Sequence, residues 1–384
     1  MVTHFCLALI LTCSLLCIKV LNKVSDENYV FTAKYLNNLI IVAFMAKELC
    51  RIKETTPVKI DKKNHKILAL LAENARMPAS EIAKKVLISR DAIAYRTNRL
   101  QKQGVILTFI PIVDLKRFGY YTYHVFLLLD EKEKEKQSAL ITFLKEHKHT
   151  KSIISYTDTW DIEWNLVAKD MYEFDTILTE IITKFSDVIL QKETLAVVKG
   201  YKSIHLPYYY YYSAGITPKL SLKEAKAIKV DKKDIELLKL LGQNSRQSSY
   251  DLGKKLGLSP DAVVYRIRRL TNANIIRQFT TVVNLSKLNY SWYTYAINFK
   301  KFDKKDDAKF AEFVRKHPHI IRAVKIFGEW DVLLYIVADS PSNYHNTVKE
   351  IKKTFSDIIQ TYQTWLANEE YIYQPLPKVI TESD

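Results

Sequence analysis

The 384-residue sequence predicts an α+β protein that contains one unit twice, and each copy begins with helices and continues with strands. Residues 61–201 and 231–371 align without insertion or deletion, at a constant offset of 170 residues (231 − 61). In each copy the apolar residues first recur at helical spacing and then alternate as in strands. The chain is therefore predicted to hold two helical modules, each followed by a sheet-containing domain.

Composition indicates a folded, basic protein. With 48% hydrophobic residues the chain can bury the cores of several domains, which excludes a disordered protein. Its 58 Lys and Arg residues against 42 Asp and Glu give a net charge of +16, which favours nucleic acid or an anionic membrane surface as partner. A generally lysine-rich proteome would produce the same excess, so charge alone names no partner.

The cysteines indicate no zinc site in either copy. All four precede the repeats, at Cys6, Cys13, Cys17 and Cys50, and no Cys/His cluster has zinc spacing. We therefore predict no metal, no cofactor and a reducing, cytoplasmic location.

The first 56 residues do not belong to the repeat. Residues 5–21 are apolar enough to resemble a signal-peptide core or a short membrane span. However, no Lys or Arg precedes them, no clean cleavage site follows, and about 17 residues is the lower limit for crossing a bilayer. We interpret Met45 as the true start of translation and expect no membrane partner. The alternative is a membrane anchor in residues 1–44.

Each helical module is predicted to contain three helices with recognisable starts. Asp61 and Asp231 suit the N-cap of the first helix, because a carboxylate can accept hydrogen bonds from its free N–H groups. Ser89 and Ser259 stand where a third helix should begin. Pro260 then occupies a first helical position, where its missing N–H costs nothing.

The third helix of each module has an apolar face and a basic face. Ile93 and Leu100 take positions that face a core, as Val263 and Leu270 do in the second copy. On the other face, Arg can donate two hydrogen bonds to guanine or phosphate and Asn can read adenine, which suits the DNA major groove. A solvated basic helix is the alternative interpretation. The residues predicted to contact DNA are Arg76, Lys84, Lys85, Arg90, Tyr95, Arg96, Asn98, Arg99, Arg246, Lys254, Lys255, Tyr265, Arg266, Arg268 and Arg269.

Strands follow each helical module. A short segment at 105–110 or 275–280 would close the module as a wing, which makes it a winged helix-turn-helix. Residues 121–197 and 292–366 then follow the order strand, helix, strand, strand, helix, strand. This βαββαβ order is the ferredoxin-like plan, a sheet with both helices on one face. The bare face is aromatic and apolar and needs a partner.

These features resemble the Lrp/AsnC family of bacterial and archaeal transcriptional regulators across both repeats. The resemblance implies a winged helix-turn-helix, then a ligand-sensing ferredoxin-like domain that pairs face to face, often assembles further and commonly binds an amino acid where such domains meet. The family pattern is carried by Asp61, Asn74, Arg76, Ser89, Ile93, Arg96, Leu100, Gly104 and Ile106, and in copy two by Asp231, Asn244, Arg246, Ser259, Val263, Arg266, Leu270, Asn274 and Ile276.

A glycine-containing turn typical of that sensing domain occurs once. Gly328 and Asp331 carry it in copy two, whereas copy one has Asp158 in place of the glycine. A carboxylate there would repel the carboxylate of an amino acid. We therefore predict effector binding at Gly328 and Asp331, with a simple hairpin turn as the alternative. Trp160 and Trp330 are expected in the core or an interface.

Two further patterns, the paired histidines and a run of tyrosines, are not assigned to a functional site. The paired histidines at 147 and 149, and at 317 and 319, lie at helix ends without a metal-ligand partner, so we expect solvated side chains whose charge suits the helix dipole. The five tyrosines at 208–212 lie in a predicted linker. They could pack on a sensing domain, stack on bases or cover a sheet edge.

The sequence thus predicts a DNA-binding transcriptional regulator with two unlike reading modules and self-association through its sensing domains. A siroheme decarboxylase-like tetrapyrrole enzyme shares the resemblance and is one alternative, although the expected arginine- and histidine-rich signature after the wing is absent; a membrane-tethered regulator is another. The predicted organisation is an extension at 1–56, winged helix-turn-helix modules at 57–112 and 228–282, sensing domains at 113–205 and 283–375, a linker at 206–227 and a tail at 376–384.

Overall fold

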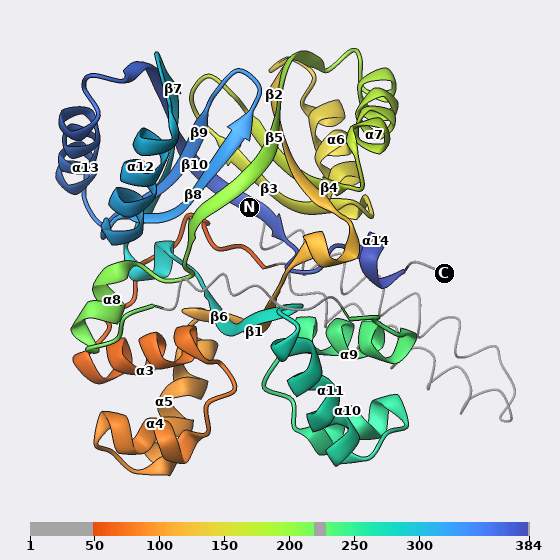
Figure 1. The fold of residues 1–384 in the computed structure, drawn as a ribbon, viewed down its shortest axis with the longest axis vertical. Helices are drawn as coiled ribbons and strands as arrows, with labels where there is room; N and C mark the ends of the chain where they lie inside the picture. The colour runs from red at the N-terminus through yellow and green to blue at the C-terminus, as the bar shows by residue number, and fades with distance from the viewer. Residues whose placement is uncertain (1–48, 219–227, 383–384) are drawn as a thin grey trace, which may run out of the picture. The chain divides into compact units, whose positions relative to one another are not determined.

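The computed structural model describes residues 49–218 and 228–382 (Figure 1). Residues from Leu49 onward form one compact unit. No helix in the described ranges is long and apolar enough to cross a bilayer. The predicted start at Met45 and the alternative anchor lie outside these residues.

Each helical module forms the three predicted helices, and we call the two modules head 1 and head 2. The Asp61 side chain accepts a hydrogen bond from the backbone N–H of Asn64 at 2.7 Å, which confirms the predicted first cap. The Ser89 and Ser259 hydroxyls cap the third helices in the same way. Head 1 consists of α3 (Lys62–Glu73), α4 (Ala79–Val86) and α5 (Arg90–Lys102), and head 2 of α9 (Lys232–Gln243), α10 (Ser249–Leu256) and α11 (Pro260–Asn272).

The strand after each head is present, but its partner differs from that of a wing. β1 (Ile106–Val113) and β6 (Ile276–Val283) pair with each other, antiparallel, in a two-stranded sheet. Each strand also contacts the opposite head. The backbone N–H of Ala75 donates to Phe279 O at 2.9 Å, and that of Ser245 donates to Phe109 O at 2.7 Å. The two strands therefore satisfy each other's open edges and cross-connect the heads.

The remainder of each repeat confirms the predicted βαββαβ order. Short 3-10 turns at Leu115–Phe118 and Ser286–Leu288 lead into the two sheets. The first repeat contains β2 (Tyr121–Leu129), α6 (Lys134–Glu146), β3 (Thr150–Tyr156), β4 (Ile162–Ala168), α7 (Met171–Lys184) and β5 (Ile189–Ser203). The second contains β7 (Ser291–Phe299), α12 (Lys304–Lys316), β8 (Ile320–Phe327), β9 (Val332–Ala338), α13 (Pro341–Thr354) and β10 (Ile359–Tyr373).

The two sheets close on each other. β5 pairs with β2 of its own repeat and with β8 of the other, while β10 pairs with β7 and with β3, so the strands form a closed barrel. The bare faces meet inside it, where the rings of Phe126 and Trp365 lie 4.9 Å apart. Trp160 and Trp330 are buried there, as expected. Each repeat thus supplies the partner that the apolar face of the other requires.

The tyrosine run forms a short helix, α8 (Tyr208–Ser213), that packs on head 1. Tyr210 is buried, and its ring centroid lies 4.6 Å from that of His65 in α3. The equivalent α14 (Lys378–Thr381) contacts α9 of head 2. Of the roles left open by the sequence, the structure supports packing on the sensing domains: Lys202 of β5 lies 5.6 Å from the Tyr208 ring centroid, and the ring centroids of Tyr210 and Tyr290 are 6.4 Å apart. The contact with head 1 was not expected.

The two heads differ in the residue that adopts a left-handed backbone conformation between the second and third helices. Leu87, between α4 and α5, adopts φ 60° and ψ 52°, the left-handed conformation that L residues with a Cβ disfavour, and its side chain is 83% exposed. The equivalent residue in head 2 is Gly257, with φ 65°, and no neighbouring group lies within 4 Å of the place where a Cβ would stand. At this position head 1 carries strain that head 2 avoids; the reverse holds after the third helix, where head 1 has Gly104 with φ 73° and head 2 has Asn274 with φ 55°.

We expect Leu87→Gly to stabilise the protein by about 0.5–1 kcal/mol, because the gain from relieving the left-handed backbone exceeds the greater entropy of glycine in the unfolded chain. Denaturant unfolding measures the change. The matched control is Gly257→Leu, which should destabilise by a similar amount. A loss of stability in Leu87→Gly would show that the leucine side chain contributes packing.

Candidate nucleic-acid interface

The outward faces of α5 and α11 are exposed and partly unengaged. Tyr95 is 67% exposed and Tyr265 is 66% exposed. The exposed side chains of Arg90, Asn98 and Arg268 make no hydrogen bond or ion pair to any residue in the described ranges. Cationic and amide donors that lack an internal acceptor are available to phosphates and base edges.

Four predicted lysines lie in the last turns of α4 and α10, directly before the third helices. Lys84 and Lys254 are exposed. Lys85 pairs with Glu81 at 3.3 Å, and the Lys255 ammonium donates to the Gln247 side chain at 2.6 Å. Such exposed contacts are weak and exchange readily, so the lysines can neutralise phosphates next to each third helix.

The arginine of the family pattern has an internal role in both heads. In head 1, Arg96 donates to the carboxylate of Asp61 at 2.6 Å and to Asn64 Oδ1 at 2.9 Å. In head 2, Arg266 contacts Asp231 and Asp234, each at 2.7 Å, and these hydrogen bonds raise the pKa of Arg266. Both arginines hold the third helix against the start of the first, and in each of them Nη1 is engaged within the head.

A single difference between the repeats changes the charge of the two faces. Asn64 in head 1 is replaced by Asp234 in head 2, and Asp234 is fully buried. Its carboxylate binds Arg269 as well as Arg266. Arg99, the equivalent of Arg269, stays exposed and makes no side-chain hydrogen bond or ion pair among the described residues. Head 1 therefore has an arginine available to a ligand at Arg99, whereas the equivalent Arg269 of head 2 is paired with Asp234.

Arg76 and Arg246, for which phosphate contact stays a prediction, link the two heads. Arg76 Nη1 donates to the backbone carbonyls of Ser245 at 2.5 Å and of Gln247 at 3.1 Å. Arg246 Nη1 donates reciprocally to Ala75 O at 2.5 Å and to Met77 O at 3.3 Å. We call this reciprocal pair the arginine clamp. Each guanidinium satisfies carbonyls in the turn of the other head, an arrangement that fixes one head against the other.

The predicted effector residues have structural partners. A Cβ at Gly328, where φ is 146°, would lie 2.7 Å from Thr194 O and 2.6 Å from a Leu195 methyl, so the glycine permits close approach of its hairpin to β5. The Asp331 carboxylate accepts a hydrogen bond from the Phe299 N–H at 2.8 Å. These contacts neither create nor exclude an effector site, and that assignment stays a prediction.

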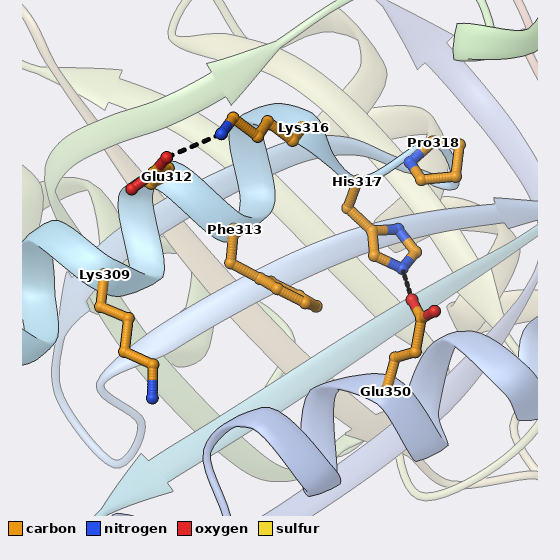
Figure 2. A pocket seen from close by; sticks show the side chains of 7 residues that line it. All are labelled: Lys309, Glu312, Phe313, Lys316, His317, Pro318 and Glu350. Carbon is orange, nitrogen blue, oxygen red and sulfur yellow. Dashed lines mark hydrogen bonds and ion pairs between the residues drawn. The ribbon is translucent and has the colours of Figure 1, made fainter.

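The histidines differ from the expectation of solvated helix ends. His149 and His317 are buried. Burial lowers the pKa of His147 and of His317 to about 4, so both are neutral near pH 7 and the helix-dipole argument is wrong for them. His317 lines an open hollow of about 390 Å³, and its Nε2 lies 2.9 Å from the carboxylate of Glu350 in α13. Figure 2 shows the side chains around this hollow. No metal-binding group of His, Cys, Asp and Glu occurs among the described residues.

Sequence reasoning missed a buried polar network inside the barrel. Glu163 accepts hydrogen bonds from His124 Nδ1 at 2.6 Å, from Tyr335 at 2.7 Å and from Tyr156. Although burial acts to raise it, these bonds lower the pKa of Glu163 to about 2, so the carboxylate is ionised. The only available signal was that the equivalent second-copy position of Glu163 is the apolar Leu333.

Comparisons with known proteins agree with this arrangement. The AsnC-type helix-turn-helix domain matches residues 60–101 and 230–271, one match in each head. Transcriptional regulator AzlB of Bacillus subtilis is 33% identical over 122 residues, covering 32% of this chain and 78% of that protein. The leucine-responsive regulatory protein of Rhizobium meliloti is 26% identical over 140 residues, covering 36% of this chain and 89% of that protein.

A solved structure shares the tandem fold. The siroheme decarboxylase NirDL has a TM-score of 0.57 at 11% identity, covering 84% of this chain and 98% of that chain. At this identity the likeness concerns the fold alone. The two domain matches and the sequence relatives show that the chain belongs to the Lrp/AsnC family, as a DNA-binding transcriptional regulator with the family's unit present twice.

Proposed function

We propose that the two heads read unlike half-sites of one duplex DNA operator. The observation that carries the proposal is the arginine clamp, because it hydrogen-bonds the two heads to each other within one chain. The paired strands β1 and β6 add a second connection. Heads joined in this way would engage DNA together, so the second contact forms at a high effective concentration. We expect half-sites separated by whole helical turns, because both third helices must face the same side of the duplex.

Differences between the exposed faces support unlike half-sites. Head 1 presents Arg90 and Asn98, whereas head 2 has Pro260 and Arg268 at those positions. Arg99 adds a free guanidinium to head 1 alone. We assign base contacts to Arg90, Asn98, Arg268 and the exposed tyrosines, and phosphate contacts to Arg99 and the lysines of α4 and α10, and we leave out the arginines that hold the heads together internally.

The finer expectations of the family belong to the same proposal. A relative is named a leucine-responsive regulatory protein, which supports an amino-acid effector for this chain, with Gly328 and Asp331 as the predicted contacts. Self-association through the sensing domains, a cytoplasmic location and the absence of catalysis are proposed with it. The second repeat already covers the bare sheet face of the first, so further assembly would use other surfaces of the barrel domain.

Binding-site selection from randomised duplex DNA should return an asymmetric consensus, since the base-contacting residues of the two heads differ. The control is a protein in which Asn98→Arg and Arg268→Asn exchange the two side chains. This exchange should alter both half-sites. A palindromic consensus from the unmodified protein would contradict the proposal.

Salt dependence separates DNA contacts from internal ones. Arg99→Ala should weaken binding and reduce the slope of log K against log salt by about 0.9, the value for one phosphate. Arg269→Ala, the matched variant in head 2, should leave the slope unchanged and lower the thermal stability, because the buried Asp234 loses a partner. Fluorescence anisotropy at several salt concentrations measures the slopes. Equal slope changes in the two variants would refute the assignment.

A tetrapyrrole enzyme is the second candidate, favoured by the tandem fold shared with NirDL and by the buried His124–Glu163 network. Absorbance spectra of the protein mixed with siroheme distinguish the candidates. A regulator leaves the Soret band unchanged, whereas a tetrapyrrole-binding enzyme shifts it, and the shift would then be lost in His124→Leu.

A further inference from the structure

Four basic side chains gather at one end of the barrel, where β3 and β8 begin and β5 ends. Lys151 and Arg322 lie at the starts of β3 and β8, each beside a register shift in its strand, and His205 follows the end of β5. Irregularities of this kind re-aim side chains. The backbone confirms the proximity of these segments, since Ser203 pairs with Arg322 and the Gln374 N–H donates to Lys151 O at 2.7 Å. The fourth side chain is Arg51.

The nearby carboxylates are already engaged. Glu370 binds Arg51 through two oxygens, at 2.9 and 2.5 Å. Asp114 pairs with Arg277 at 2.6 Å. Glu163 accepts its hydrogen bonds from His124 and from tyrosine hydroxyls. Among residues 49–218 and 228–382, none accepts a hydrogen bond from the side chain of Lys151 or Arg322.

These basic side chains are enclosed, yet Lys151, Arg322 and His205 keep some accessible surface. Burial, together with the charges of Arg322, Arg51 and Arg277, lowers the pKa of Lys151 to about 7. Burial also lowers the pKa of His205 to about 3, with Arg51, Arg322 and Lys151 contributing. The groups therefore lie within electrostatic reach of one another. Lys151, Arg322 and His205 are each only partly buried, so solvent and small solutes reach part of each residue.

We propose that Lys151, Arg322 and His205 form a binding site for a small dianion, which carries either one phosphate group or two carboxylate groups. The enclosed guanidinium of Arg322 and the protonated amine of Lys151 lack acceptors, which is costly, and an anion would supply both the acceptors and the opposite charge. His205, neutral near pH 7, would contribute a ring N–H. The Arg322 guanidinium lies 5.0 Å from the Tyr335 ring centroid, and the Tyr335 hydroxyl donates to Glu163 at 2.7 Å. This stacking orients a planar fork suited to bidentate binding.

The site draws on both repeats and occurs once. The residue equivalent to Lys151 in the second copy is Ile321, and the one equivalent to Arg322 in the first copy is Ser152. A bound anion would connect β3 to β8 across the barrel. The site is separate from the exposed faces of the heads and from the Gly328 turn, and its stoichiometry is one anion per chain.

Titration calorimetry on the full chain tests the site, with sodium phosphate and sodium succinate as probes at constant ionic strength set by sodium chloride. We expect one site per chain. In a double variant, Lys151→Met with Arg322→Met, the affinity should fall roughly tenfold to a hundredfold, as expected for lost charge-assisted hydrogen bonds. The control, Lys148→Met with Arg315→Met, removes the same charge from exposed positions and should bind as the unmodified protein does.

Melting temperatures in sodium chloride alone separate binding from a structural role. Without a bound anion, the Lys151/Arg322 variant should melt at or above the temperature of the unmodified protein, because mutual repulsion is relieved. A lower melting temperature would overturn the proposal, as would equal affinities in the variant and its parent or no binding of either probe. Tighter binding of phosphate or of succinate supports the site and identifies the ligand's acidic group.

Discussion

Pairing between the edge strands of the two repeats is the constraint on which the structure depends. β5 and β10 each extend beyond their own sheet to pair with the other repeat, and this closes the barrel. The closure buries the aromatic faces of both sheets and leaves no open edge in the barrel. β1 and β6 also pair between the repeats, and the arginine clamp joins the two heads. Neither repeat therefore completes its own hydrogen bonding alone.

A fused pair need not remain symmetric, and the internal contacts show where symmetry was lost. Replacement of Asn64 by Asp234 ties down Arg269 and leaves Arg99 free. Glu163, His124 and Lys151 occur only in the first repeat. In an oligomer of identical chains, every such change would appear in each subunit, whereas here it appears once. The interior polar network and the cationic end of the barrel are therefore features that a symmetric dimer could not build in this form.

Local features were predictable because they depend on neighbouring residues. The caps at Asp61 and Ser89 and the order of strands and helices follow from short-range hydrogen bonding and periodicity. The sequence predicts the strand that follows each head but not its pairing, because the partner strand belongs to the other repeat. Arg96 and Arg99 illustrate the same limit: they are three residues apart on one helix, yet only the packed first helix determines which of them is free. The expectation of solvated histidines at the helix ends was wrong because their burial depends on packing against the sheet, which the helix sequence does not show.

The sequence by itself determined the duplicated unit, its α+β composition, the starts of its helices, its basic charge and its family. Periodicity and internal identity carry that information directly. The tertiary structure alone decided which charges remain available, because each arginine or lysine either finds a distant acceptor or does not. The clamp between the heads, the closed barrel and the unpaired cations at its end all arise from contacts between repeats, and such contacts leave no pattern within either repeat.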